Sequence, residues 1–151
     1  MNRISKVIKL GIGAALAAAL VSWAAPQAGA TKITVYKSPT CGCCGKWAEY
    51  LRQNGFQVKT EEVADMNKIK VERGVPAQLS SCHTAVVDGY VVEGHVPAGT
   101  IRKMLSERPP VRGITVTSMA PGSPGMEGRR NIPYNVLTFD AKGQTTVYER
   151  H

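Results

Sequence analysis

The stretch that decides the fold is KITVYKSPTCGCCGKWAEYLRQNG, residues 32–55. Its first residues, 32–36, alternate polar and apolar side chains, which is typical of a half-buried β-strand. From Cys44 to Leu51, apolar side chains recur at intervals of three and four residues, which predicts an amphipathic α-helix. Asn54-Gly55 is a typical helix end. The stretch therefore predicts a strand, a cysteine-rich turn and a helix in direct succession.

The remaining sequence predicts an α/β fold. The expected elements are a strand at 56–63, a helix from Asp65 to near Gly74, strands at 84–87 and 90–92, a helix from Pro97 that ends at 108–110, and a C-terminal hairpin with strands at 132–139 and 144–148. Asp88-Gly89 between two β-rich runs predicts a type I′ hairpin turn. The order β-α-β-α-β-β-α is the thioredoxin-like arrangement, here with an added C-terminal β-hairpin. In that arrangement the motif after the first strand lies at the N-terminus of the first helix.

Residues 1–30 are predicted to be a secretory signal peptide, followed by a single thioredoxin-like metal-binding domain at 31–151. Three basic residues precede the uncharged apolar run 10–21, and Ala28-Gly29-Ala30 fits a cleavage site. Without those three cations the formal charge falls from +8 to +5, and the remaining charges are scattered. This pattern argues against nucleic-acid binding, and the mature part has no apolar run of membrane-spanning length.

Four cysteines carry the strongest functional information: Cys41, Cys43, Cys44 and Cys82. Two structural disulfides would be the ordinary expectation in a secreted protein. The spacing argues against them, because at most one residue of the triplet can pair with Cys82. The other two would have to bridge each other across one residue or none, which is strained.

A helix N-terminus lowers the pKa of a cysteine and favours the thiolate, which is both a nucleophile and a soft metal ligand. Cys41 and Cys44 have the two-residue separation of a redox pair, but Cys43 has no role in simple dithiol exchange. Three adjacent thiolates also do not easily surround one tetrahedral zinc ion. Crowded sulfurs can bridge several soft ions, so the triplet favours Cu(I).

Further candidate ligands lie outside the triplet. Cys82 precedes a predicted central strand whose start approaches the first helix, so we expect its thiol near the triplet, with the His83 imidazole beside it. His95 follows a strand and could be a ligand or could cap the turn. Met119 and Met126 flank a Gly/Pro-rich loop, where their thioethers could bind Cu(I), cover the site, or anchor the loop by packing.

Four motifs, found in order at 38–44 (SPTCGCC), 82–84 (CHT), 89–97 (GYVVEGHVP) and 122–127 (GSPGME), resemble the CopG-type copper-resistance proteins. These belong to a family long described as a domain of unknown function. The resemblance extends over residues 33–149. It implies a periplasmic, thioredoxin-like protein in which the four cysteines hold copper as a multinuclear cluster.

The resulting hypothesis is a periplasmic protein of copper resistance that holds more than one Cu(I) per chain and cycles between Cu(I) and Cu(II). Its expected partners are copper ions and other periplasmic copper-handling proteins. One alternative is a thiol-disulfide oxidoreductase, with Cys41 as nucleophile and Cys44 as resolving thiol. A second alternative is a carrier of zinc or mixed metals. A family resemblance does not establish turnover, so enzymatic activity is left open.

Overall fold

The computed structural model describes residues 29–117, 119–128 and 130–151. The predicted signal peptide lies outside these residues, except for Gly29 and Ala30 at its cleavage site. Within the described ranges, none of the helices combines the length and the apolar character that crossing a membrane requires.

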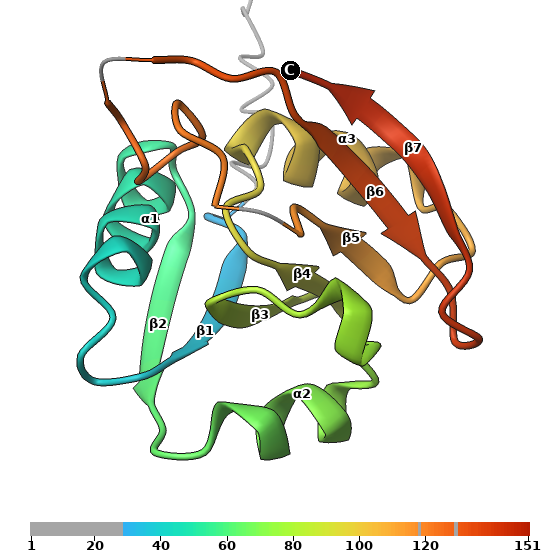
Figure 1. The fold of residues 1–151 in the computed structure, drawn as a ribbon, viewed down its shortest axis with the longest axis horizontal. Coiled ribbons are helices and arrows are strands. Elements are labelled where there is room, and N and C mark those ends of the chain that lie inside the picture. Colours follow the sequence, from blue (N-terminus) through green and yellow to red (C-terminus); the bar gives the residue numbers. More distant parts are fainter. Residues whose placement is uncertain (1–28, 118, 129) are drawn as a thin grey trace, which may run out of the picture.

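In the described part of the chain, seven strands form one mixed sheet that packs against three α-helices (Figure 1). The elements are β1 (Lys32–Lys37), α1 (Gly42–Gln53), β2 (Gln57–Glu62), α2 (Met66–Arg73), a 3-10 helix (Ala77–Leu79), β3 (His83–Val87), β4 (Tyr90–Glu93), α3 (Ala98–Glu107), β5 (Gly113–Thr115), β6 (Asn135–Phe139) and β7 (Thr145–Arg150).

The predicted α/β class, the element order and the C-terminal hairpin are confirmed. The structure adds β5, which joins the core sheet to that hairpin. The first hairpin strand begins at Asn135 rather than at residue 132, and Pro133, which lacks a backbone N–H for a strand ladder, lies before its start. Asp88 and Gly89 have φ values of 48° and 85°, the conformation that a type I′ turn requires.

The sheet order is β2-β1-β3-β4-β5-β6-β7, so β1 lies between parallel β2 and antiparallel β3. Lys37 at the end of β1 is paired with His83 at the start of β3. The chain leaves β1 toward α1 at this point, and it enters β3 at the same point. The pairing therefore brings the segment after β1 and the segment before β3 together.

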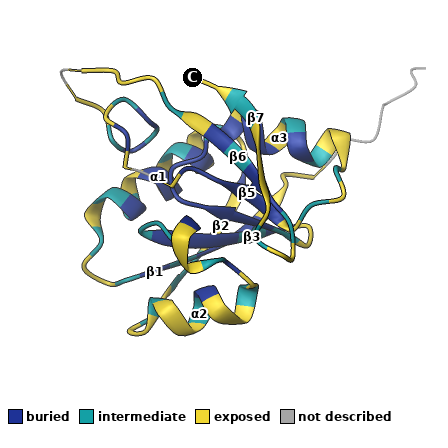
Figure 2. Cartoon of the chain, turned by 45° about the vertical axis from the view of Figure 1, so that its right-hand side comes forward, coloured by how far each residue is buried: buried dark blue, intermediate teal, exposed yellow. Residues whose placement is uncertain are grey.

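Helices α1 and α3 lie on one face of the sheet and α2 lies on the other (Figures 1 and 2). Successive side chains of β4 point to opposite faces of the sheet. Val92 belongs to the larger apolar cluster, whereas Val91 packs in a smaller cluster with Val75 and Leu79. Helical members of the larger cluster are Trp47, Leu51, Ile101 and Met104. Figure 2 shows buried residues along the central strands and on the inner faces of the helices.

We expect Ile101→Ala to lower the free energy of unfolding by about 2–5 kcal/mol, because it leaves a cavity in the larger cluster. Val71→Ala is a matched control, since Val71 is 78% exposed on α2 and its truncation should change stability by less than about 0.5 kcal/mol. Urea denaturation of the reduced protein measures both values. Equal losses would contradict this assignment of the core.

Candidate metal centre

The cysteine triplet occupies the N-terminus of α1. The helix begins at Gly42, earlier than the apolar periodicity predicts, so that Cys43 and Cys44 lie in its first turn and Cys41 is its N-cap residue. The Cys41 N–H donates to the Ser38 carbonyl at 3.1 Å, which turns the chain from β1 into the helix. All three sulfurs are therefore held near the positive end of the helix, where a negative charge is favourable.

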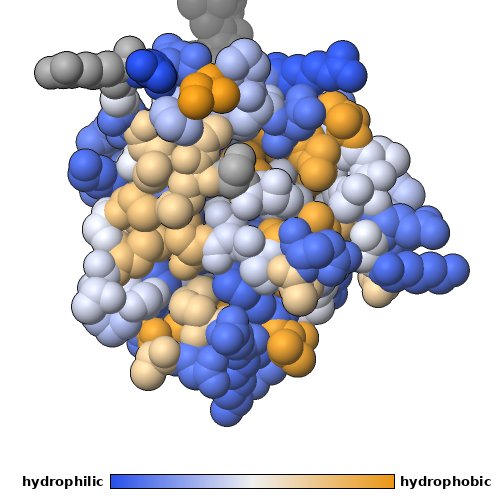
Figure 3. Space-filling view, in the orientation of Figure 1, coloured by the Kyte–Doolittle hydropathy of each residue, from blue (hydrophilic) through white to orange (hydrophobic). Residues whose placement is uncertain are grey.

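The start of β3 brings the fourth cysteine to the same place. Cys82 precedes His83, and the Cys82 carbonyl oxygen lies 3.8 Å from Cys44 Sγ. The sulfurs of the four cysteines all lie within 4.8 Å of one another. Cys44 is fully buried and the other three keep partial exposure. Figure 3 shows moderately hydrophobic surface gathered over the side of the molecule that carries α1.

Cys41 and Cys44 form a disulfide bond, whereas Cys43 and Cys82 are free. The expectation that the triplet can close on itself only across one residue or none is therefore wrong. One helical turn brings the Cα atoms of Cys41 and Cys44 to 5.4 Å, an ordinary distance for a disulfide. Cys41 Sγ also lies 3.5 Å from Cys43 Sγ. Because a disulfide sulfur is not a thiolate, the disulfide and a metal site with four thiolates are mutually exclusive states.

Two histidines flank the Cys82 thiol, and the three ligand atoms again lie within 4.8 Å of one another. His95 Nδ1 lies 2.7 Å from the Pro124 carbonyl oxygen, which can only accept, so this nitrogen carries the proton. The lone pair of His95 Nε2 then faces Cys82 Sγ at 3.1 Å. A histidine that donates its other N–H to a carbonyl is oriented as metal-binding histidines are.

His83 is fully buried, and its Nδ1 lies 3.3 Å from Cys82 Sγ. Its ring packs on Trp47 with centroids 4.3 Å apart, and its Nε2 has no hydrogen-bond partner among the described residues. Burial lowers the pKa of His83 well below its ordinary value, and the neighbouring His95 and Lys70 add to this effect. Burial likewise lowers the pKa of His95. Both rings are therefore neutral near pH 7, the form that binds metals.

The loop at 119–128 packs directly on the first turns of α1. A Cβ atom at Gly125, where φ is +81°, would fall 2.9 Å from the backbone nitrogen of Trp47 and 3.1 Å from the Cys43 carbonyl oxygen. Met126 is half-buried immediately after this contact, whereas Met119 is 53% exposed. The fold thus brings the backbone at Gly125, next to Met126, into contact with the triplet. Met119, by contrast, is largely exposed to solvent.

We expect Gly125→Ala to displace this loop, because its Cβ would meet backbone atoms that cannot move aside and its φ is unfavourable for alanine. The variant should be cut faster by trypsin after Arg129 or Arg130, the tryptic sites that directly follow the loop, and its melting temperature should fall. Gly128→Ala is the matched control, since a Cβ atom there would lie 4.0 Å from the Met126 carbonyl oxygen, an ordinary contact distance. Indistinguishable cleavage of the two variants would contradict the close packing.

Burial, and next the charge of Cys43, raise the pKa of the Cys82 thiol to about 11. We expect alkylation of Cys82 by iodoacetamide in the metal-free protein with the Cys41–Cys44 disulfide intact to accelerate with pH around that value rather than around the ordinary 9.0. Peptide mass spectrometry after timed alkylation measures the rate at Cys82 separately. A half-maximal rate at pH 9 or below would contradict this prediction.

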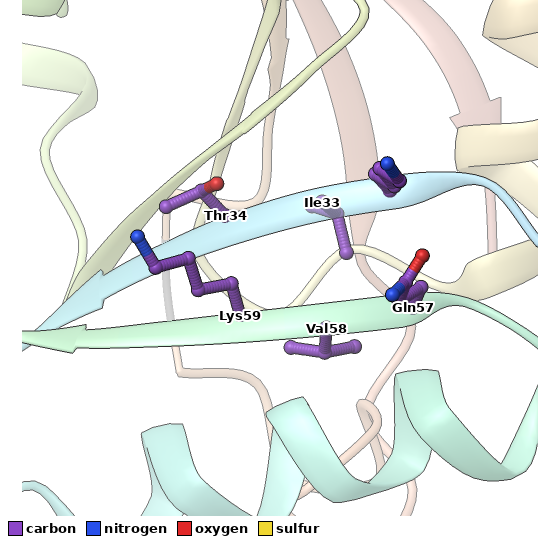
Figure 4. Close-up of a pocket in the computed structure, with 6 residues that line it drawn as sticks. Ile33, Thr34, Gln57, Val58 and Lys59 are labelled. Atoms are coloured by element: carbon purple, nitrogen blue, oxygen red, sulfur yellow. The ribbon is translucent and has the colours of Figure 1, made fainter.

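A surface pocket of about 410 Å³ lies elsewhere, along the paired strands β1 and β2 (Figure 4). Its lining consists of Lys32, Ile33, Thr34, Gln57, Val58 and Lys59. This set has no thiol, imidazole or carboxylate, and Figure 4 shows Val58 pointing to the helix side while Lys59 points away from it. This pocket therefore lacks the soft and imidazole ligands that gather around the N-terminus of α1 and the start of β3.

Glu93, the last residue of β4, is a buried acidic residue near the centre that sequence reasoning missed. Its carboxylate is fully buried and accepts a hydrogen bond from the Ser81 N–H, immediately before Cys82. An acidic residue at the end of an otherwise apolar strand, two positions before His95, is the sequence signal that could have identified it.

A family model described as "Protein of unknown function, DUF411" matches residues 79–126, which include Cys82 and both histidines of the centre. Two solved structures, "Copper resistance protein copG- Form 1" and "Copper resistance protein copG- Form 2", are similar to the whole domain. Each is 44% identical to this chain, covers 81% of it and 98% of its own chain, and superposes with a TM-score of 0.76. No protein with a curated description matches the chain.

Proposed function

This chain belongs to the family of the copper resistance protein CopG, and from that premise we propose that it binds copper as Cu(I) in a cluster held by Cys41, Cys43, Cys44 and Cys82. The proposal includes more than one Cu(I) ion per chain. It places the protein in the periplasm, where copper resistance would need such a site.

The single observation that carries the proposal is the crowding of four cysteine sulfurs within 4.8 Å. Thiolates prefer soft ions, and sulfurs packed this closely satisfy several Cu(I) ions best by bridging them. Zinc prefers one tetrahedral set of ligands, with pairs supplied from separate parts of a fold. Here three of the four sulfurs come from one helix terminus, which favours copper over the zinc or mixed-metal alternative.

The metal-binding form is the fully reduced chain. The Cys41–Cys44 disulfide must first be reduced by a two-electron donor such as an external dithiol, which becomes oxidised to a disulfide, to supply two of the four thiolates. The raised pKa of Cys82 means that its thiol keeps a proton near neutral pH, so loading with copper must release that proton.

The neighbouring histidines extend the donor set on the Cys82 side. His95 Nε2 and His83 Nδ1 point at the Cys82 sulfur, within reach of an ion bound there. Imidazole and thiolate together suit both oxidation states of copper, which supports cycling between Cu(I) and Cu(II). Met126 is the thioether that we propose as a further ligand or cover, and its loop is held against α1 by Gly125. Met119, being more exposed, has the weaker support.

A second candidate function, thiol-disulfide exchange, is favoured by the disulfide itself. Cys41 and Cys44 are paired at a helix N-terminus, with the half-exposed Cys41 in the position of an attacking thiol. In this alternative Cys43 and Cys82 have no part in the reaction. Cys43 is therefore the residue whose removal separates the two functions.

We expect the reduced protein, titrated anaerobically with Cu(I), to bind more than one equivalent. Cys43→Ser should weaken Cu(I) binding as much as Cys41→Ser or Cys44→Ser does, by more than about tenfold, since even groups outside the coordination shell cost roughly 10–100-fold. Competition with a chromophoric Cu(I) chelator measures the affinity and the stoichiometry.

The same variants provide the control for the second function. Exchange chemistry needs Cys41 and Cys44 alone, so in an insulin-reduction assay Cys43→Ser would retain activity while the other two lose it. Saturation at one equivalent, or a full complement of copper in Cys43→Ser, would contradict the cluster. A preference for zinc in direct competition would favour the carrier.

A further inference from the structure

Glu93 is a buried carboxylate that belongs to neither group of candidate metal ligands. It ends β4 with no exposed surface, and it forms an ion pair with Lys70 of α2, whose side chain is 7% exposed. This pair lies on the α2 face of the sheet, behind the start of β3, the strand that Cys82 immediately precedes. Removing two charges from water is costly, so a pair in this position calls for a physical explanation.

The Glu93 carboxylate holds both residues that flank the Cys82-His83 dipeptide. One oxygen accepts from the Ser81 N–H at 2.6 Å, and the other accepts from the Thr84 hydroxyl at 2.7 Å. Lys70 Nζ donates to the first oxygen and also to Thr84 Oγ1 at 3.1 Å. The network therefore clamps the chain immediately before and immediately after Cys82-His83.

The segment of Glu93 itself carries the third candidate ligand, His95. Between them Gly94 donates its N–H to the His83 carbonyl at 3.2 Å. A Cβ atom at Gly94 would fall 2.6 Å from Ser81 Oγ, so these segments are in close contact. Glu93 thus sits at the junction of the two segments, 81–84 and 93–95, that present ligand atoms around Cys82 Sγ.

Stability alone is a poor explanation for this pair. Replacing both members of a buried ion pair with apolar residues of similar volume is often neutral or stabilising. Such a replacement removes the carboxylate that accepts from Ser81 and Thr84 but leaves no unpaired charge inside the fold. The contacts of the carboxylate instead join the segments that carry the candidate ligands.

We propose that Glu93, fixed by Lys70, is a positioning residue that holds Cys82, His83 and His95 in the geometry that binds metal. This inference rests on the proposed copper binding for its biological meaning. The clamp itself exists in the metal-free chain, so it can be tested with and without copper.

The test compares the double variant Lys70→Met/Glu93→Leu with Val136→Ala. The double variant removes the clamp while keeping an apolar pair in its place. Val136→Ala lowers stability through the larger cluster, on a strand that pairs with neither β3 nor β4, and leaves the clamp intact. Melting temperature and far-UV circular dichroism establish that both are folded.

Two readouts report on the site. In the reduced, metal-free protein at about pH 8, alkylation of Cys82 should be about tenfold faster in the double variant, while alkylation of Cys43 stays unchanged. With copper, Cu(I) affinity should fall by about 10–100-fold, the usual cost of losing a group that orients a ligand. Val136→Ala should match the wild type in both readouts, even if it melts at a lower temperature.

Wild-type rates and affinity in a folded double variant would overturn the proposal, and so would an equal acceleration of Cys82 alkylation in Val136→Ala. If the double variant does not fold, Glu93→Gln replaces it, because an amide keeps the shape but lacks the charge that pairs with Lys70, and only one of its two polar atoms can accept a hydrogen bond. If the wild type binds no copper, the proposed function fails, and the alkylation rates still decide whether Glu93 positions Cys82.

Discussion

The antiparallel pairing of β1 with β3 is the constraint on which the rest of the site depends. It places Lys37, where the chain leaves for α1, opposite His83, where the chain enters β3. The first turn of α1 and the residue before β3 are therefore neighbours, although 38 positions separate Cys44 from Cys82. The register of β1 against β3 brings the sulfurs together, so their assembly does not require the ordering of a long loop.

The same arrangement gives the four sulfurs two chemical states. When Cys41 and Cys44 are joined, only Cys43 and Cys82 remain as thiols. When the disulfide is reduced, four sulfurs are available at the positive end of α1, with two neutral imidazoles beside Cys82. The redox state of one cysteine pair therefore decides whether all four sulfurs are available as thiolates. This links the copper proposal and the exchange alternative through the same atoms.

Much of the fold could be predicted from local sequence patterns, because those patterns act within a few residues. Asp65 caps α2 through Lys68, and Asp88-Gly89 adopts the turn that its composition favours. The thiol pairing could not be predicted as reliably, since it depends on the residue at which α1 begins. The buried Lys70–Glu93 pair depends on which residues face each other across the sheet and α2, and a polar helix of eight residues gives no local indication of that.

The central claim is that several copper ions share the four sulfurs. X-ray absorption at the copper K-edge tests it most directly on protein that was reduced and loaded anaerobically with Cu(I). For a shared cluster we expect sulfur as the dominant neighbour of copper, together with a copper–copper scattering contribution that disappears in Cys43→Ser. A spectrum with isolated copper ions, or with nitrogen and oxygen as the dominant neighbours, would contradict it.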